Sequence, residues 1–160
     1  MEQPPLLQLE TVGDYKNHYE QHYCRGNIVT ADGIRIYFTP QKFGHAFYEN
    51  TLRKKGPKDE FSKIRAECMD WIKSTLEHPE AELYMGWNKE DRCHEENRRV
   101  SVVYENFIVV IELSLNQRDE LKGNFVTCYV ADKSITQIRN SPEWNKEQCL
   151  AKLRKNKNGR

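Results

Sequence analysis

The sequence predicts an α+β fold with N-terminal helices packed on an antiparallel β-meander sheet and a C-terminal helix. Apolar residues recur at helical spacing over residues 59–76, and residues 98–130 are rich in β-branched side chains. Ser141-Pro142-Glu143 has the pattern of a helix start, with a capping hydroxyl, proline and an acid. At 160 residues, the chain suits a single domain over 1–160.

The first elements are predicted to be short. Residues 1–9 contain two prolines and suggest a loose leader. An aromatic stripe at helical spacing predicts a helix over residues 10–23. Strands at 28–29 and 34–38 are expected to meet at an Asp-Gly turn, before a short helix at 41–50.

Residues 59–76 give the clearest helical pattern. Its apolar side chains are three or four residues apart: Phe61, Ile64, Cys68, Trp71, Ile72 and Leu76. Arg65 borders this stripe, whereas Lys63 and Asp70 fall on the polar side. A strand at 81–87 and an exposed, charged stretch at 88–97 are expected next.

The strongest strand pattern contains a tight hairpin. Glu105 and Asn106 separate two apolar runs, so Tyr104 pairs with Phe107 and Arg99 lies opposite Glu112. By alternation, one face of this hairpin carries six side chains: Arg99, Ser101, Val103, Ile108, Val110 and Glu112. Thr127 and Tyr129 share a face of the next strand, and the pattern leaves open whether Glu112 lies on that face. The last helix is expected from residue 141 to about residue 155.

Composition limits the function classes. The net charge is +1, so any surface that attracts nucleic acid must be local. Five scattered cysteines favour reduced thiols in a cytoplasm. The chain has no apolar run long enough to span a membrane and no secretory pattern, so we expect a soluble cytoplasmic protein without a membrane partner.

His45 and Arg65 are the first candidates for chemistry. Phe43 and Phe47 flank His45 and would hold its imidazole at the rim of the core, where it can transfer protons near neutral pH. A structural, hydrogen-bonded histidine is the alternative. Arg65 at the core margin needs either acceptors for its donors or a bound anion, so a salt bridge competes with an anion site.

The strands supply four more candidates. Arg99 and Glu112 form either a cross-strand ion pair or a phosphate clamp and a general base. The hydroxyls of Thr127 and Tyr129 are possible donors to a phosphate, although both residue types also favour strands.

Metal chemistry has weak support in the sequence. His18, His22 and Cys24 lie close together and Cys93-His94 follows later, but the paired spacing of a zinc site is missing. We therefore expect no metal and no other cofactor.

The order of four motifs resembles a known family. A His-Ala-Phe motif at 45–47 precedes Phe-Ser-Lys-Ile-Arg-Ala at 61–66, the strand pair at 99–112 and Phe-Val-Thr-Cys-Tyr at 125–129. This order resembles the phage- and prophage-associated nuclease-like domains of the barnase–EndoU–colicin–RelE (BECR) fold, over about residues 32–131. The resemblance implies a toxin-like endoribonuclease that cleaves RNA without metal.

Six residues form the expected catalytic set. His45, Arg65 and Thr127 match the family by position, and Arg99, Glu112 and Tyr129 join them through the strand register. His45 would act as base or acid with Glu112 or Tyr129 as its complement. The two guanidiniums would surround the phosphate and Thr127 would position it.

Basic residues outside this set are expected to contact the RNA backbone. They are Arg53, Lys54, Lys55, Lys63, Lys152, Arg154 and Lys155. A solvated charge run is the alternative for each segment. The expected partners are tRNA, rRNA or mRNA and a protein inhibitor or antitoxin. Because the strands are mostly valine and isoleucine rather than basic, a non-catalytic nucleic-acid or protein-binding module is the second hypothesis, and a small-molecule enzyme the third.

Overall fold

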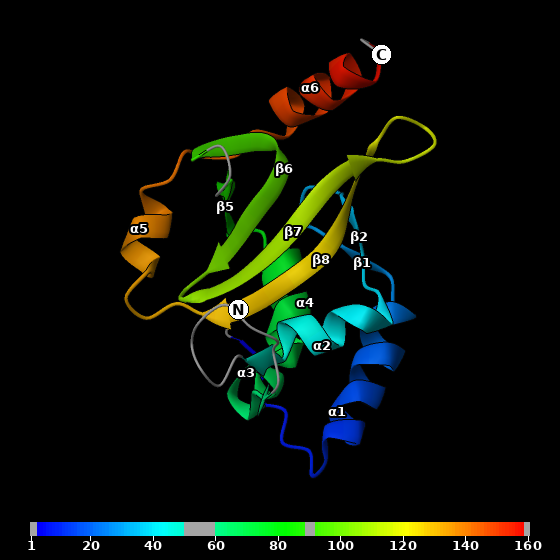
Figure 1. Cartoon of the computed structure of the whole chain (residues 1–160), viewed down its shortest axis with the longest axis vertical. Coiled ribbons are helices and arrows are strands. Elements are labelled where there is room, and N and C mark those ends of the chain that lie inside the picture. The colour runs from blue at the N-terminus through cyan, green and yellow to red at the C-terminus, as the bar shows by residue number, and fades with distance from the viewer. Residues whose placement is uncertain (1–2, 50–59, 89–91, 159–160) are drawn as a thin grey trace.

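A computed structural model describes residues 3–49, 60–88 and 92–158 and confirms the α+β class. A mixed sheet has the strand order β1-β2-β8-β7-β6-β5 (Figure 1). Its strands are β1 (Ile28–Val29), β2 (Arg35–Tyr37), β5 (Glu82–Asn88), β6 (Cys93–Tyr104), β7 (Phe107–Leu115) and β8 (Leu121–Val130). A separate two-stranded pair joins β3 (Tyr48–Glu49) and β4 (Glu60–Phe61).

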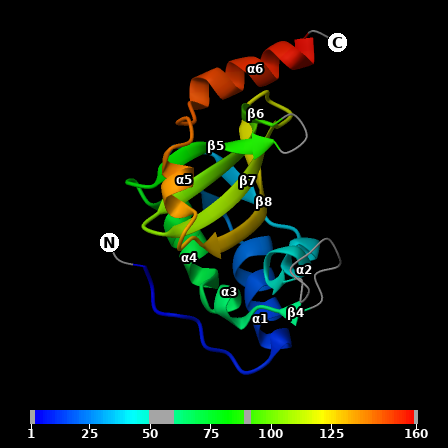
Figure 2. The ribbon, with the colours of Figure 1, turned by 60° about the vertical axis from the view of Figure 1, so that its left-hand side comes forward.

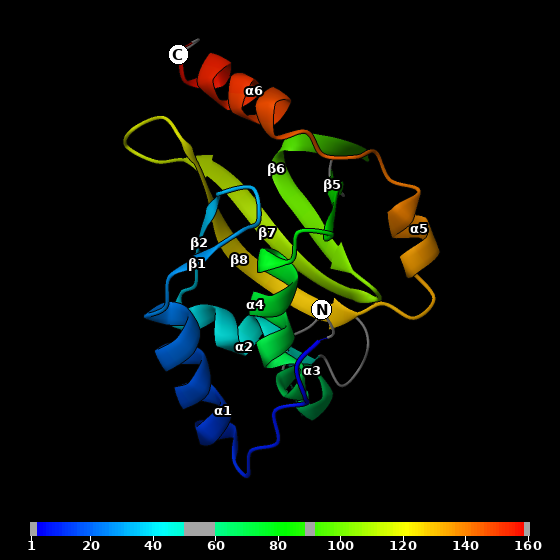
Figure 3. The ribbon, with the colours of Figure 1, turned by 180° about the vertical axis from the view of Figure 1, so that it is seen from behind.

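Helices pack behind the sheet and at its ends (Figure 3). The N-terminal set comprises α1 (Val12–Tyr19), the π-helix η1 (Glu20–Cys24), the 3-10 helix η2 (Pro40–Lys42), α2 (Phe43–Ala46), α3 (Lys63–Glu67) and α4 (Met69–Glu77). Two helices follow the sheet in sequence, α5 (Ile135–Arg139) and α6 (Lys146–Asn158). Figure 2 shows α6 beyond one end of the sheet and α5 beside the sheet.

The predicted hairpin register is confirmed. Tyr104 pairs with Phe107 and Arg99 with Glu112. Glu105 adopts a φ of 55° in the two-residue turn, as tight hairpin turns require. The strand predicted at 81–87 is β5, so β5 to β8 form a four-stranded antiparallel meander.

The parallel pairing of β2 with β8 was not predicted. Ile36 lies beside Gly123, where a Cβ would come within 2.6 Å of Ile36 Cδ1. Gly123 therefore leaves the space that Ile36 fills between the two strands. The predicted turn at Gly33, with a φ of 89°, joins β1 to β2.

Tyr19 lies at the centre of an aromatic cluster between the helices and the sheet. Its ring is fully buried and contacts Phe38, Phe43, Phe47 and Phe125. Its hydroxyl donates to the carbonyl oxygen of Thr39 at 2.7 Å. Burial accounts for most of the stabilisation here, and the hydrogen bond satisfies the one polar atom of the ring.

The leader is not loose. The N–H of Leu7 donates to the Glu67 carbonyl at 2.8 Å, and Trp71 Nε1 donates to the Pro4 carbonyl at 2.6 Å. The Tyr15 hydroxyl also donates to the Leu7 carbonyl at 2.9 Å. Residues 3–9 thus lack regular structure but are fastened across α1, α3 and α4.

The helix predicted over 59–76 is broken. Its first residues form β4, and Cys68, with φ −90° and ψ 10°, separates α3 from α4. Because the break rotates the helical face, Ile64 is 72% exposed instead of buried in the apolar stripe. Lys63 is exposed, as predicted, and Asp70 forms a 2.8 Å contact with His18 Nε2.

The start of the last helix was also predicted wrongly. Residues 141–144 are extended along the outer edge of β5, where Met85 N–H donates to the Pro142 carbonyl and Trp144 N–H to the Leu83 carbonyl. Asn145 caps α6 by accepting from the N–H of Gln148 at 2.9 Å. The edge of β5 thereby gains backbone partners. The stretch expected to be exposed at 88–97 also contains the start of β6.

We predict that the Tyr19 hydroxyl contributes measurably to stability. Tyr19→Phe removes one of the two hydrogen bonds that the Thr39 carbonyl accepts, the other coming from the Lys42 N–H, and should cost about 1 kcal/mol of unfolding free energy. Tyr19→Ala also removes the ring and should cost about 3–5 kcal/mol. Urea unfolding measures both values, with Tyr37→Phe at an exposed position as the matched control. Equal stability of Tyr19→Phe and the unchanged protein would contradict the prediction.

The five free cysteines should differ sharply in reactivity. Burial raises the pKa of Cys128 to about 12 and that of Cys68 to about 11, whereas Cys93 is exposed. Because the thiolate is the nucleophile, iodoacetamide at pH 8 should modify Cys93 first and Cys128 only after unfolding. Peptide mass spectrometry over time follows each site. Modification of native Cys128 as fast as Cys93 would refute this order.

Candidate functional site

The candidate residues on the strands share one face of the sheet. Thr127 lies opposite Val110, which is on the same side of β7 as Glu112. A bulge between Val110 and Ile111 in this pairing gives β8 one extra residue, so Asn124 also lies opposite Glu112. The structure therefore resolves the open question: Thr127 and Tyr129 share the face of Arg99 and Glu112, opposite the N-terminal helices.

This face is only partly covered. At one end, Ile135 and Ile138 of α5 pack with Tyr129 against a small buried cluster around Ile108 and Val103. Side chains farther along are partly exposed, and the front of β7 and β8 is free of helices in the part of the chain drawn as ribbon (Figure 1). We call this region, lined by Arg99, Glu112, Ser114, Lys122, Asn124 and Thr127, the open face.

Arg65 lies at the edge of β8. Its Nη1 donates to the Ala46 carbonyl at 3.4 Å, and its Nε is 3.6 Å from Glu49 Oε1. Its charge lowers the pKa of both Cys128 and Tyr129 against the larger raising effect of burial. The helix that carries Arg65, α3, contacts β8, which agrees with an effect on two residues of that strand.

His45 is at the rim, as expected. Phe43, Ala46 and Phe47 are buried, while His45 is exposed on α2. Arg65 donates to the carbonyl of the next residue, Ala46, which ties α2 to α3. Both helices contact β8. We call His45, Arg65, Thr127 and Tyr129 the edge group.

Within the edge group, the hydroxyl of Tyr129 has a shifted pKa. Burial raises its pKa above the usual value for tyrosine, and Arg65 offsets part of that increase. The phenol is therefore protonated at neutral pH and available as a proton donor. Thr127 is two residues away on the same face.

Arg99 and Glu112 are separate from the edge group. Arg99 pairs with Glu112, and Glu112 pairs with Asn124 of β8. Along β8, Asn124 and Tyr129 are separated by on the order of 15 Å. The cation against Glu112 is Arg98, at 3.8 Å from Nε to Oε1, in place of the expected Arg99. Arg99 and Glu112 therefore lie apart from Tyr129, and the predicted residues do not share a single phosphate-sized space.

Arg99 itself is constrained. Its Nε is buried and has no hydrogen-bond partner among the described residues. Gly86 lies against it, since a Cβ at Gly86 would come within 2.6 Å of Arg99 Cβ.

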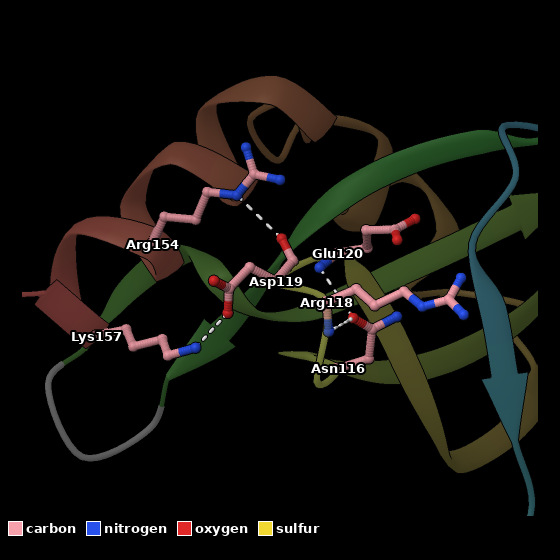
Figure 4. Close-up of polar contacts among 6 residues, drawn as sticks. All are labelled: Asn116, Arg118, Asp119, Glu120, Arg154 and Lys157. Carbon is pink, nitrogen blue, oxygen red and sulfur yellow. Dashed lines mark hydrogen bonds and ion pairs between the residues drawn. The ribbon is translucent and has the colours of Figure 1, made fainter.

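The expected RNA-contacting residues have different surroundings. Arg154 donates through Nε to the Asp119 carbonyl at 2.9 Å, and Lys157 pairs with the Asp119 carboxylate (Figure 4). Arg154 therefore fastens α6 to the β7–β8 turn through its Nε. Lys63, Lys152 and Lys155 are exposed. Arg53, Lys54 and Lys55 lie outside the described residues.

Three residues on the same face were not predicted as functional. Arg35 pairs with Lys122 across β2 and β8, and Tyr37 pairs with Asn124. Arg35 Cζ is 4.9 Å and Lys122 Nζ 5.9 Å from the centroid of the Tyr37 ring. The alternation Arg-Ile-Tyr about buried Ile36 was a signal for a shared face, but its position beside β8 depends on pairing distant in sequence.

Two cavities lie away from these groups. One of about 240 Å³ is lined by Asp32, His78 and apolar residues, and one of about 440 Å³ by Glu82, Tyr84 and neighbours. No group of three or more potential metal ligands occurs in the described parts of the chain. No helix there has the length and apolarity needed to cross a membrane.

Comparisons with protein-family models, curated proteins and solved structures find no match to this chain.

The placement of Arg65 at the β8 edge can be tested through Tyr129. Arg65→Gln removes the charge that lowers the phenol's pKa, so that pKa should rise. The ¹³Cζ chemical shift of labelled tyrosine, followed with pH, measures the change. Arg99→Gln is the matched control and should have a smaller effect, because it lies farther along the sheet. An equal shift in both variants would contradict the placement.

Proposed function

We propose that this protein is a metal-independent endoribonuclease whose cleavage site is the edge group. The observation that supports the proposal best is the state of Arg65. Its side chain is 27% exposed, and its contacts to Glu49 and the Ala46 carbonyl are long, at 3.6 and 3.4 Å. A guanidinium has five N–H donors, so donors remain for a phosphate.

The surroundings of Arg65 supply the other chemical roles. Exposed His45 adjoins the carbonyl that Arg65 contacts, and Tyr129 lies within the electrostatic range of Arg65. A base, a cation and a protonated acid are the components required for RNA cleavage without metal.

The proposed reaction uses these groups in order. His45 takes the proton of a ribose 2′-hydroxyl, and the 2′-oxygen forms a bond to phosphorus. Arg65 stabilises the charge on the pentacoordinate phosphorane and Thr127 orients a non-bridging oxygen. The phosphorus–O5′ bond breaks as Tyr129 gives its proton to O5′. The products are a 2′,3′-cyclic phosphate and a 5′-hydroxyl.

In this proposal, Arg99 and Glu112 are not part of the reacting centre. Glu112 faces Arg98 at 3.8 Å and lies far along β8 from Tyr129, so the role of base is assigned to His45. Arg99 instead holds another phosphate of the same RNA, at a distance that suits a strand lying along the open face.

The cellular role proposed is toxin-like. An enzyme that cleaves tRNA, rRNA or mRNA damages the cytoplasm in which it is made, so a protein inhibitor is the natural partner. A phage or prophage source is part of the same proposal. Its support is the motif resemblance described above.

The cleavage assay uses purified protein, labelled RNA and EDTA. His45→Ala and Arg65→Ala should each reduce the cleavage rate about 10²–10³-fold, as expected for loss of a catalytic proton carrier or charge stabiliser. His22→Ala and Arg139→Ala are matched controls, since His22 is exposed and Arg139 has a similar 3.6 Å contact to Glu82. Both controls should cleave normally.

Retained cleavage in both edge-group variants would reject these assignments. RNA that is bound but uncleaved by the unchanged protein would favour a non-catalytic binding module. The strands carry few basic residues, and this observation favours the binding module as the second candidate function.

A further inference from the structure

Tyr37 is an exposed aromatic residue on the open face. Its side chain is 44% exposed, although it belongs to a strand inside a six-stranded sheet. The alternation of β2 explains this exposure, because Ile36 is buried against Gly123 and its neighbours point to the other face. A ring so placed contributes little to the core.

Two cations lie against this ring, both from the cross-strand pair that precedes it along the parallel strands. Arg35 and Lys122 lie within 4.9 and 5.9 Å of the ring centroid. Arg35 donates through Nη2 to the Gly26 carbonyl at 3.1 Å, and its Nε is buried with no hydrogen-bond partner among the described residues. We call Arg35, Tyr37 and Lys122 the Tyr37 platform.

The charge around the platform is positive, although the whole chain is nearly neutral. Arg118 extends from the β7–β8 turn away from α6 (Figure 4). Two nearby carboxylates are already paired, Glu112 with Arg98 and Asp119 with Lys157. Glu120, which is exposed in the same turn, is the opposing charge.

We propose that the Tyr37 platform binds a single-stranded segment of RNA, with one base stacked on the ring and adjacent phosphates held by Arg35 and Lys122. This inference rests on the proposed function, because it specifies the form of RNA that reaches the edge group. An exposed aromatic ring beside cations on a sheet is a surface on which unpaired bases stack. Bases in a duplex are stacked on each other and do not present their faces to such a ring.

The platform and the edge group each include residues of β8. Lys122 is near one end of β8 and Tyr129 near the other, on one face. Their separation, on the order of 20 Å, corresponds to a few nucleotides of extended RNA. A base on Tyr37 therefore lies several nucleotides from the bond proposed to be cleaved.

The test measures binding without cleavage. The probe is a fluorescein-labelled 12-nucleotide 2′-O-methyl oligouridine, which lacks the attacking hydroxyl, and fluorescence anisotropy gives its affinity for the full chain. Tyr37→Ala and Tyr37→Leu should weaken binding about 5- to 100-fold through loss of stacking. Tyr37→Phe keeps the ring and should bind within about twofold of the unchanged protein.

Salt dependence tests the cations. Lys122→Ala should reduce the slope of log affinity against log salt by about 0.7, as for one lost phosphate contact to a single strand. A 2′-O-methyl duplex of the same length should bind without dependence on Tyr37. Tyr37→Leu keeps apolar bulk in the strand, so its urea midpoint separates lost stacking from lost folding.

Each result bears on one proposal. Unchanged affinity in folded Tyr37→Ala and Tyr37→Leu, or an equal Tyr37 dependence for duplex, would overturn the platform even if His45-dependent cleavage is observed. Tyr37-dependent binding of the probe, together with no cleavage of ordinary RNA, supports the platform and overturns the nuclease. Binding of an acidic peptide in preference to the oligonucleotide would also overturn the platform.

Discussion

The packing of Tyr19 among aromatic rings is the constraint on which the layered structure depends. Tyr19 comes from α1, Phe43 and Phe47 from α2 and its end, and Phe125 from β8. These contacts hold α2 beside the sheet. They also determine which side of α2 is buried. His45 is left outside because its neighbours occupy the inside. The aromatic core thus sets the position of the first candidate catalytic residue.

The second constraint is the local geometry of β8. The bulge opposite Val110 and Ile111 keeps Asn124 and Thr127 on the same face, although they are three residues apart. A regular strand would turn one of them toward the helices. The parallel pairing with β2 ends at Tyr37 and Asn124, so Arg65 approaches the strand beyond that point. One strand therefore carries Thr127 and Tyr129 of the edge group together with Lys122 of the Tyr37 platform.

Local patterns predicted the parts of the fold that local forces determine. Alternation and turn length fixed the Arg99–Glu112 register, and flanking aromatics placed His45 at the rim. The break at Cys68 escaped prediction because its helical spacing continues through the break. Ser141 does not begin the last helix, because residues 142–144 instead form backbone hydrogen bonds with the edge of β5. Tyr37 was missed because its neighbours come from a strand far away in sequence.

The parallel β2–β8 pair also has a consequence for synthesis on the ribosome. Arg35 is translated before its partner Lys122, and β5, β6 and β7 are translated between them. Contacts between such distant segments form late, since a long loop must close first. A nascent chain that ends before β8 has Tyr37 without Lys122, and it also lacks Thr127 and Tyr129. The surface proposed to recognise RNA is consequently assembled only after β8 has been translated.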